Sequence, residues 1–216
     1  DQLGIKEVLQ VGGAQAIAAL AYGTDSVKSV DKVVGPGNIF VATAKKQVFG
    51  KVDIDMIAGP SEVLIIADTN ANPEYVAADL IAQAEHDDKA SAICLTTSVK
   101  LAKLISTQIK KQSSSLKRRD IINASIKQNG TIFVLKNLDD CINFTNAFAP
   151  EHLEIFVKQS SQVENKILNA GSIFVGENSG EAFGDYIVGT NHVLPTAGSA
   201  KFSSGLGVLD FMKRSS

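Results

Sequence analysis

Short apolar runs rich in β-branched residues alternate along this chain with longer segments of helical periodicity, and this alternation restricts the possible folds more than any other feature. Several of the runs, such as Val63–Ala67, are apolar without interruption, which is typical of strands that are buried on both faces of a parallel sheet. Strict alternation of strands and helices implies β–α–β crossovers. The sequence therefore predicts an α/β fold that is doubly wound, with mostly parallel sheets.

The expected elements follow from these patterns and from their boundary residues. We expect strands at Lys32–Val34, Glu62–Ala67, Ser91–Thr96, Thr131–Leu135, His152–Val157 and Ser172–Val175. We expect helices at Ala14–Tyr22, Asn38–Phe49, Pro73–Glu85, Val99–Lys111, Leu138–Ala147 and Gln162–Ala170. Asn72 supplies an N-cap for the helix that begins at Pro73. Gly171 follows the last expected helix, where a left-handed C-cap is common.

Composition favours a packed globular core and argues against a nucleic-acid partner. Of the 216 residues, 44% are hydrophobic and 20% are charged, as in ordinary folded domains. The formal net charge is −2, so the basic surface that is typical of nucleic-acid-binding domains is not expected. One basic cluster brackets Ser113–Ser115, and we interpret it as a solvated loop between helices.

Cysteine usage and hydropathy bear on the compartment. Cys94 and Cys141 are too far apart for a CxxC site, and we expect both to be buried structural thiols. We find neither the pattern of a signal peptide nor an apolar run of membrane-spanning length. We therefore expect a cytoplasmic protein without a membrane partner.

The chain changes character at two places. The break around Asp53–Pro60 is expected to divide two sheets, and Gly176–Gly207 is rich in glycine and serine with little periodicity, which predicts a loop-dominated functional or interface region. The chain enters a helix-like segment at once, and Leu206–Arg214 resembles the beginning of an element. We therefore expect the chain to be a piece of a longer protein.

The three histidines of the chain have neighbours that suggest chemistry, and the first is His86. Gln83 and His86 are three positions apart at the end of an expected helix, so their side chains leave the same helix face. An amide oxygen and an imidazole nitrogen placed in this way can share a metal ion. The alternative is a solvated helix terminus, where a protonated histidine is favoured by the helix dipole.

The second histidine, His152, directly follows Glu151 at the beginning of an expected strand. A carboxylate and an imidazole side by side are a plausible acid/base pair. Within the strand, His152 and Glu154 would point one way and Glu151 the other, so both members of the pair face one site only if Glu151 still belongs to the loop after Pro150. The alternative is an exposed turn.

The third histidine, His192, shares a glycine-rich loop with Asp185, and the two are possible metal or substrate ligands. Alternatively, Asp185 is a turn or cap residue and His192 packs locally. A second glycine-containing loop, Gly35–Asn38, follows an expected strand and opens a helix, so its backbone N–H groups could bind a phosphate. It does not match the GxGxxG pattern, and as a signal for nucleotide binding it is weak.

Taken together, these segments resemble one enzyme family. In order they read VGGAQAIAALAYG, GPGN, DM-x-AGPSEVL, QAEH, APEHLE, GDY-x-x-GTNHVLPT and SSGLG-V-x-DF-x-K. The chain resembles histidinol dehydrogenase from about Gln10 to Arg214. The resemblance implies incomplete Rossmann-like domains and the oxidation of L-histidinol to L-histidine through L-histidinaldehyde, in two steps that each use NAD⁺.

The resemblance also implies a zinc site and an acid/base pair. Gln83, His86 and Asp185 match three zinc ligands of the family, and Glu151 and His152 match its acid/base pair. Zinc would hold the imidazole and the amine of histidinol and thereby position the carbinol carbon. His152 would take the hydroxyl proton, and Glu151 would activate the water that attacks the aldehyde.

Further contacts are implied with the substrate and with NAD. Ser61 and His192 match residues that contact the substrate, together with the three zinc ligands and His152. Gln15 and Asn38 match positions that contact NAD. On this basis we expect part of the NAD-contacting domain at residues 1–58, the main domain with the zinc and substrate site at 59–207, and the start of a truncated C-terminal region at 208–216.

In the family, the fourth zinc ligand is a histidine and a nearby glutamate binds substrate, both in a C-terminal domain that the partner subunit of a homodimer supplies. Both lie beyond Ser216, so we expect shared active sites in a homodimer and an isolated chain that is inactive. Two alternatives remain open. The chain could be a non-catalytic α/β module that keeps the fold and the dimer surface, or it could belong to a relative that oxidises another amino alcohol.

Overall fold

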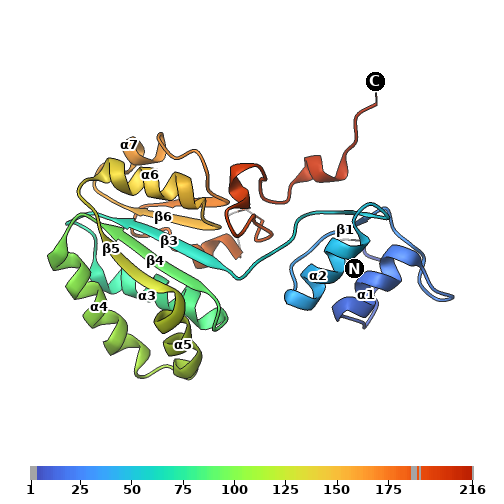
Figure 1. Cartoon of the computed structure of the whole chain (residues 1–216), viewed down its shortest axis with the longest axis horizontal. Helices are drawn as coiled ribbons and strands as arrows, with labels where there is room; N and C mark the ends of the chain where they lie inside the picture. The colour runs from blue at the N-terminus through green and yellow to red at the C-terminus, as the bar shows by residue number, and fades with distance from the viewer. Residues whose placement is uncertain (1–3, 186–188, 190, 216) are drawn as a thin grey trace. The chain divides into compact units, whose positions relative to one another are not determined.

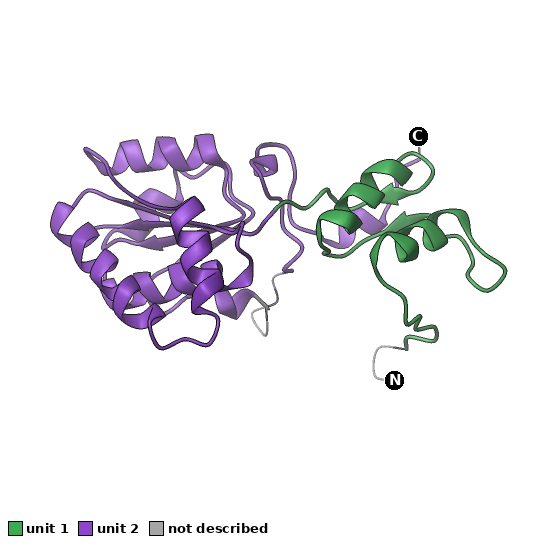
Figure 2. Ribbon diagram, turned by 60° about the horizontal axis from the view of Figure 1, so that its bottom comes forward, with its two compact units in different colours: residues 1–59 green, residues 60–216 purple. Residues whose placement is uncertain are grey.

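The computed structural model describes residues 4–185, 189 and 191–215 (Figure 1). It separates into two compact units, Asp1–Gly59 and Pro60–Ser216 (Figure 2). We call them the N-terminal unit and the C-terminal unit and describe each by itself. Within the described part of the chain, no helix combines the length and the apolar character that a membrane span requires.

The N-terminal unit is a small α/β unit with a two-stranded parallel sheet. In chain order it contains α1 (Gly13–Tyr22), β1 (Lys32–Val33), α2 (Ile39–Val48) and β2 (Asp53–Ile54). β1 pairs with β2 in parallel, with Lys32 opposite Asp53. A small core forms between the helices and the strands from the buried residues Ile17, Ala21, Val33, Val48 and Val52.

The C-terminal unit is built on a five-stranded sheet in which all neighbouring strands are parallel. The strand order is β5-β4-β3-β6-β7. Their bounds are β3 Glu62–Ala67, β4 Ser91–Thr96, β5 Gly130–Val134, β6 His152–Phe156 and β7 Ser172–Val175. The chain starts in the middle of the sheet, builds one edge and then crosses to the other, which is the order of a doubly wound fold.

Helices cover both faces of this sheet (Figure 1). One face carries α3 (Pro73–His86), α4 (Val99–Ser113) and α5 (Arg119–Asn129), and the other carries α6 (Leu138–Phe148) and α7 (Ser160–Glu164). The predicted α/β class with parallel sheets is confirmed.

The central strand β3 shows why both faces must be covered. Val63 and Ile65 pack in the cluster that contains α3 and α4, whereas Leu64 and Ile66 pack in the cluster that contains α6 and α7. All four are fully buried, and each such side chain contributes roughly 1.5–3 kcal/mol relative to exposure. The two expected buried thiols are confirmed, with Cys94 in the first cluster and Cys141 in the second.

Side-chain caps determine where several helices begin. The Asn72 side chain accepts the Glu74 N–H, and Pro73 takes the first position of α3. Ser98 caps α4 and Asn137 caps α6 in the same way. Each cap satisfies a backbone donor that the helix leaves without a partner, at a gain of about 1 kcal/mol.

The helix expected at Gln162–Ala170 is wrong in extent, because α7 covers only Ser160–Glu164. The chain after α7 binds the side chain of Asn146 instead of continuing the helix. Asn146 Nδ2 donates to the Lys166 carbonyl (3.0 Å), and its Oδ1 accepts the Leu168 N–H (2.7 Å). These bonds replace the helical partners of the backbone.

The left-handed C-cap expected at Gly171 is also wrong, because Gly171 is not among the residues with positive φ. The reason for a glycine here is a close approach. A Cβ atom at this position would lie 2.6 Å from the Glu151 carbonyl oxygen and 3.2 Å from Pro195 Cδ. Gly171 therefore lets the beginning of β7 pack directly against the segment that carries Glu151.

Among the strands and α-helices, β2 and α5 were not expected from the sequence. β2 has two residues and no fully buried side chain, so it carries no periodic signal. α5 buries Ile122 against Ile81 and Ala84 of α3. The loop that we expected around Ser113–Ser115 covers residues 114–118, because Ser113 is the last residue of α4 and Arg119 is the first residue of α5.

The segment after β7 is dominated by loops, as expected. Its described elements are the short 3₁₀ helices η1 (Glu181–Asp185), η2 (Ser199–Lys201) and η3 (Val208–Phe211). The exposed apolar residues Val208, Leu209, Phe211 and Met212 lie in or next to η3.

Candidate functional site

The predicted acid/base pair lies at the beginning of β6, next to the beginning of β3. The two strands are parallel neighbours with Val63 opposite His152, so Glu62 and Glu151 come to the same edge of the sheet. Open α/β sheets usually bind ligands beyond the carboxyl ends of their strands. Here the candidate residues gather at the amino ends.

Glu151 and His152 face one another, because the strand begins only at His152. Glu151 therefore belongs to the preceding loop, which is the condition that the sequence analysis set for a joint site. The two side chains are about 8% and 11% exposed, with 3.7 Å between Glu151 Oε2 and His152 Nδ1. Glu151 Oε2 also accepts the Glu62 N–H at 2.9 Å.

The surroundings of His152 determine which ring nitrogen carries the hydrogen. Nδ1 lies 3.1 Å from the Glu62 carbonyl oxygen, and carboxylate oxygens of Glu151 and Glu181 lie at 3.7 and 3.8 Å. The nearest of these groups, the Glu62 backbone carbonyl, can only accept a hydrogen bond, so we assign the hydrogen to Nδ1, which donates to it. Nε2 then carries the lone pair that a general base requires.

The Glu151 carboxyl is strongly perturbed. Its pKa is raised to about 8, chiefly by burial and also by the nearby charges of Glu62 and Glu181, against hydrogen bonds from the Glu62 N–H and the Ser61 side chain. A carboxyl with a pKa near neutrality can both accept and release a proton under physiological conditions.

Gln83 is fully buried and lies next to Glu181 of η1. With its amide nitrogen turned toward that carboxylate, it donates to Oε1 at 3.3 Å and to Oε2 at 3.0 Å. In this orientation the amide nitrogen of Gln83 faces Glu181 and the amide oxygen does not. The amide oxygen is therefore the atom of Gln83 that can bind a metal ion.

The structure brings together only part of the predicted site. Ser61, half-buried before β3, reaches Glu151, and Gln83 is linked to His152 through Glu181. His86 is the exposed last residue of α3, and His192 is exposed as well. Asp185 ends η1, but its side chain lies outside the described part of the chain.

Glu62 and Glu181 were missed by the sequence analysis, although both contact the acid/base pair. Glu62 is the first residue of an expected strand and Glu181 lies in a glycine-rich loop, so neither had a periodic neighbour to mark it. Glu154 carried a signal, because it points the same way as His152 in the strand.

The donor set at this site suits a cation. Glu62 Oε2 is buried without a hydrogen-bond partner among the described residues, and burial raises the Glu62 pKa. The Glu181 and Glu151 carboxyls lie in the same cluster. A cation would offset this excess of acceptors, although the described residues alone form no group of three histidine, cysteine or acidic side chains around one metal position.

The residues expected to contact NAD lie in the N-terminal unit. Gln15 is exposed in the first turn of α1. Asn38 is the N-cap of α2, and its side chain accepts the N–H groups of Phe40 and Val41. These two donors are therefore already bonded, so a phosphate at this helix end would have to compete with Asn38.

A buried ion pair holds the loop that contains Gly35. Lys45 and Asp55 form the pair, with side chains 4% and 1% exposed. Lys45 Nζ donates to the Gly35 carbonyl at 2.9 Å, and Asp55 accepts the Gly35 N–H at 2.7 Å. The loop that precedes Asn38 is thus fastened through both backbone polar groups of one glycine.

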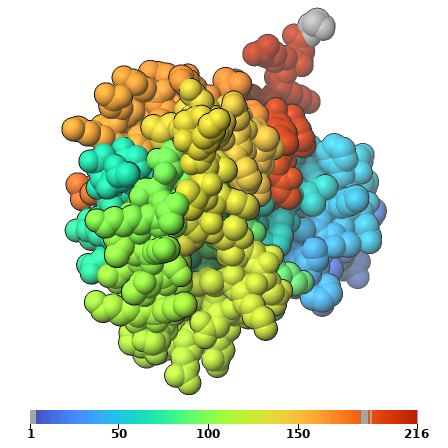
Figure 3. Space-filling model, turned by 60° about the vertical axis from the view of Figure 1, so that its left-hand side comes forward, coloured from blue at the N-terminus to red at the C-terminus, as the bar shows by residue number. Residues whose placement is uncertain are grey.

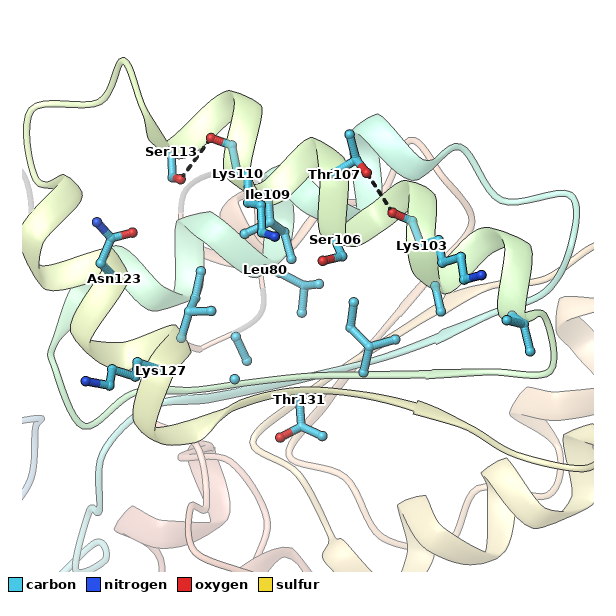
Figure 4. Close-up of a pocket in the computed structure, with 16 residues that line it drawn as sticks. Leu80, Lys103, Ser106, Thr107, Ile109, Lys110, Ser113, Asn123, Lys127 and Thr131 are labelled. Carbon is cyan, nitrogen blue, oxygen red and sulfur yellow. Dashed lines mark hydrogen bonds between the residues drawn. The ribbon is translucent and has the colours of Figure 1, made fainter.

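A cavity of about 730 Å³ lies away from this site, between α4, α5 and β5 (Figure 4). Its lining includes Leu80, Ile109, Ile132 and the three lysines Lys103, Lys110 and Lys127. Figure 3 shows the face of the C-terminal unit on which α4, in green, lies next to α5 and β5, in yellow-green to yellow. None of the predicted site residues is among its lining residues.

Comparison with known proteins identifies the family. The family model for histidinol dehydrogenase matches residues 1–216. The chain belongs to the histidinol dehydrogenase family. The histidinol dehydrogenase of Lactococcus lactis is 58% identical over 210 residues, which are 97% of this chain and 49% of that protein. The one of Aquifex aeolicus is 54% identical over 213 residues, 99% of this chain and 50% of that protein.

Solved structures agree with this assignment. A histidinol dehydrogenase from Elizabethkingia anophelis matches 95% of this chain and 47% of its own, with a TM-score of 0.91 and 45% identity. An NAD-dependent aldehyde dehydrogenase from Sinorhizobium meliloti matches 81% of this chain and 46% of its own, with a TM-score of 0.50 and 14% identity, which shows a likeness of fold alone.

The histidinol dehydrogenase resemblance inferred from the sequence is therefore confirmed, and so is the expectation of a partial chain, because the chain spans about half the length of the curated relatives it matches.

Proposed function

We propose that the protein to which this chain belongs oxidises L-histidinol to L-histidine through L-histidinaldehyde, with NAD⁺ as oxidant. Family membership supports the reaction. The observation that carries the assignment of roles is the joint placement of Glu151 and His152, with the Glu62 carbonyl oxygen 3.1 Å from His152 Nδ1.

The two oxidation steps use the pair in different ways. In the first, His152 Nε2 takes the hydroxyl proton of the alcohol while the carbinol hydride leaves, and the aldehyde forms. In the second, Glu151 takes a proton from the water that adds to the aldehyde, and loss of a second hydride gives the carboxylic acid. Its raised pKa makes the Glu151 carboxylate a stronger base than an ordinary carboxylate.

Zinc and NAD⁺ are the cofactors that we propose for this site. Gln83, His86 and Asp185 would hold zinc, which when bound positions the imidazole and amine of the substrate. Gln15 and Asn38 would contact NAD. Ser61 and His192 would contact the substrate.

We further propose a homodimer with shared active sites, because the ligand set of this chain needs a histidine from a C-terminal domain of the partner. An incomplete ligand set binds zinc weakly, so the isolated 216 residues are expected to show little or no turnover. Robust activity of the isolated chain would contradict this part of the proposal.

The test uses the full-length protein, loaded with zinc and supplied with histidinol and NAD⁺, and measures NADH. His152→Ala is expected to slow the alcohol step by about 100- to 10,000-fold. Glu151→Gln is expected to slow mainly the aldehyde step, which is measured with histidinaldehyde as the substrate, by a factor in the same range. No NADH from the wild-type protein would refute the proposed reaction. Equal loss in both steps for both variants would refute the division of roles.

A further inference from the structure

Two carboxyl groups, Asp79 and Glu154, lie directly behind the site. Glu154 is two residues after His152 on β6, so both side chains lie on the same face of the sheet. Asp79 is one helical turn before Gln83 on α3. The Glu154 side chain is completely buried. Each of the two carboxyls therefore lies beneath one residue of the site.

The contacts of this pair are unusual for two acids. The two carboxyl groups are close enough to interact directly with each other, and Glu154 Oε1 accepts the Glu181 N–H at 2.9 Å. Glu154 Oε2 is buried without a hydrogen-bond partner among the described residues. Two ionised carboxylates have only acceptor atoms, so a hydrogen bond between them requires a proton.

No cation balances the pair within the described residues, since neither Asp79 nor Glu154 takes part in an ion pair there. The remaining charged group that faces Glu154 is Glu181, which is also acidic. Burial, and for Glu154 also the charge of Asp79, raises the pKa of both carboxyls. Two negative charges on neighbouring buried carboxyls repel each other, which favours a state in which only one of the two carboxyls is ionised.

The pair also fastens the loop that enters the site. Glu154 holds the backbone of Glu181, and Gly180 passes so close to Asp79 that a Cβ atom there would lie 3.3 Å from Asp79 Oδ1. Beyond these two points, the Glu181 carboxylate reaches the Gln83 amide and His152 Nδ1.

We propose that Asp79 and Glu154 share one proton at neutral pH and act as positioning residues that hold η1, so that Glu181 orients the Gln83 amide oxygen toward the metal position. The part of this inference that concerns zinc rests on the proposed function. The shared proton does not, because it follows from the buried acid–acid contact alone.

The test compares three variants of the full-length protein. Glu154→Gln keeps the shape and, with a neutral amide, both hydrogen bonds. Glu154→Ala removes them. Glu164→Gln makes the same chemical change at an exposed position of α7 and serves as the matched control.

Two readouts follow, neither of which is activity. The infrared spectrum of each variant is subtracted from that of wild type, with zinc-free protein at neutral pH, so that the protonated Glu151 carboxyl common to all of them cancels. The difference spectrum should contain the C=O band of a protonated carboxyl for Glu154→Gln and none for Glu164→Gln. Zinc titration should show an affinity loss of about 10- to 100-fold for Glu154→Ala, with Glu154→Gln close to wild type.

Each contrary result has a definite meaning. Absence of the protonated-carboxyl band from the difference spectrum of wild type and Glu154→Gln overturns the shared proton. Wild-type zinc affinity in Glu154→Ala overturns the positioning role. If Glu154→Ala does not fold, an affinity loss in Glu154→Gln of the size expected for alanine overturns it instead. A full-length protein without dehydrogenase activity refutes the proposed reaction but leaves the infrared test unchanged.

Discussion

The raised pKa of Glu151 predicts a specific dependence of stability on pH. We consider Glu151→Gln in the zinc-free full-length protein. The wild-type side chain is about 8% exposed, and burial raises its pKa from 4.5 to about 8. The amide of Gln can still accept the Glu62 N–H, so the substitution removes the titration and little else.

The sign follows from proton binding. Between pH 4.5 and about 8 the folded protein keeps a proton on Glu151 that the unfolded chain has released. Stability is therefore greatest below the unfolded pKa and falls as pH rises, by about 1.4 kcal/mol per pH unit for one proton. Over the whole interval the loss is at most roughly 5 kcal/mol, and Glu151→Gln should not show it.

The assay is urea unfolding at a series of pH values from 5 to 8. The free energy of unfolding of Glu151→Gln should gain steadily on that of wild type as pH rises. Glu164→Gln, at an exposed position, should run parallel to wild type. Parallel curves for Glu151→Gln and wild type would show that burial does not keep this carboxyl protonated, and would refute the reasoning.

Two further predictions concern packing and charge. Gly171→Ala should lower the free energy of unfolding by about 1–3 kcal/mol and impair the aldehyde step, because the new Cβ atom would collide with the Glu151 carbonyl. The control is Gly12→Ala, whose Cβ atom would meet no atom within 4 Å. Equal stability of the two variants would contradict this prediction. Lys45→Met should cost about 3–5 kcal/mol in urea unfolding and weaken NAD binding, because it leaves Asp55 buried and unpaired; a loss below about 1 kcal/mol would mean that solvent screens the pair.

Much of the fold could be predicted from the sequence, because its signals are local. The strands at Glu62–Ala67, Ser91–Thr96 and Ser172–Val175 have the expected bounds, since uninterrupted apolar runs have few other solutions. The helix after Ser160 could not be predicted correctly, because its early end depends on the side chain of Asn146, from another helix.

The site divides in the same way. The motifs around Glu151 and His152 are contiguous, so the sequence predicts an acid/base pair and its place at the beginning of a strand. Its partners are remote: Glu62 lies 90 positions from His152 along the chain, and only the parallel pairing of β3 with β6 brings them together. No local pattern marks Glu62 or Glu181.

By itself, then, the sequence determined the α/β class, the family and the residue types available for chemistry, because these depend on local pattern and on motif order. Only the tertiary structure decided which ring nitrogen of His152 carries the hydrogen, why Glu151 holds its proton up to a pKa of about 8, and why Asp79 and Glu154 must share one. Protonation depends on burial and on neighbouring charges, and both exist only once distant segments have packed together.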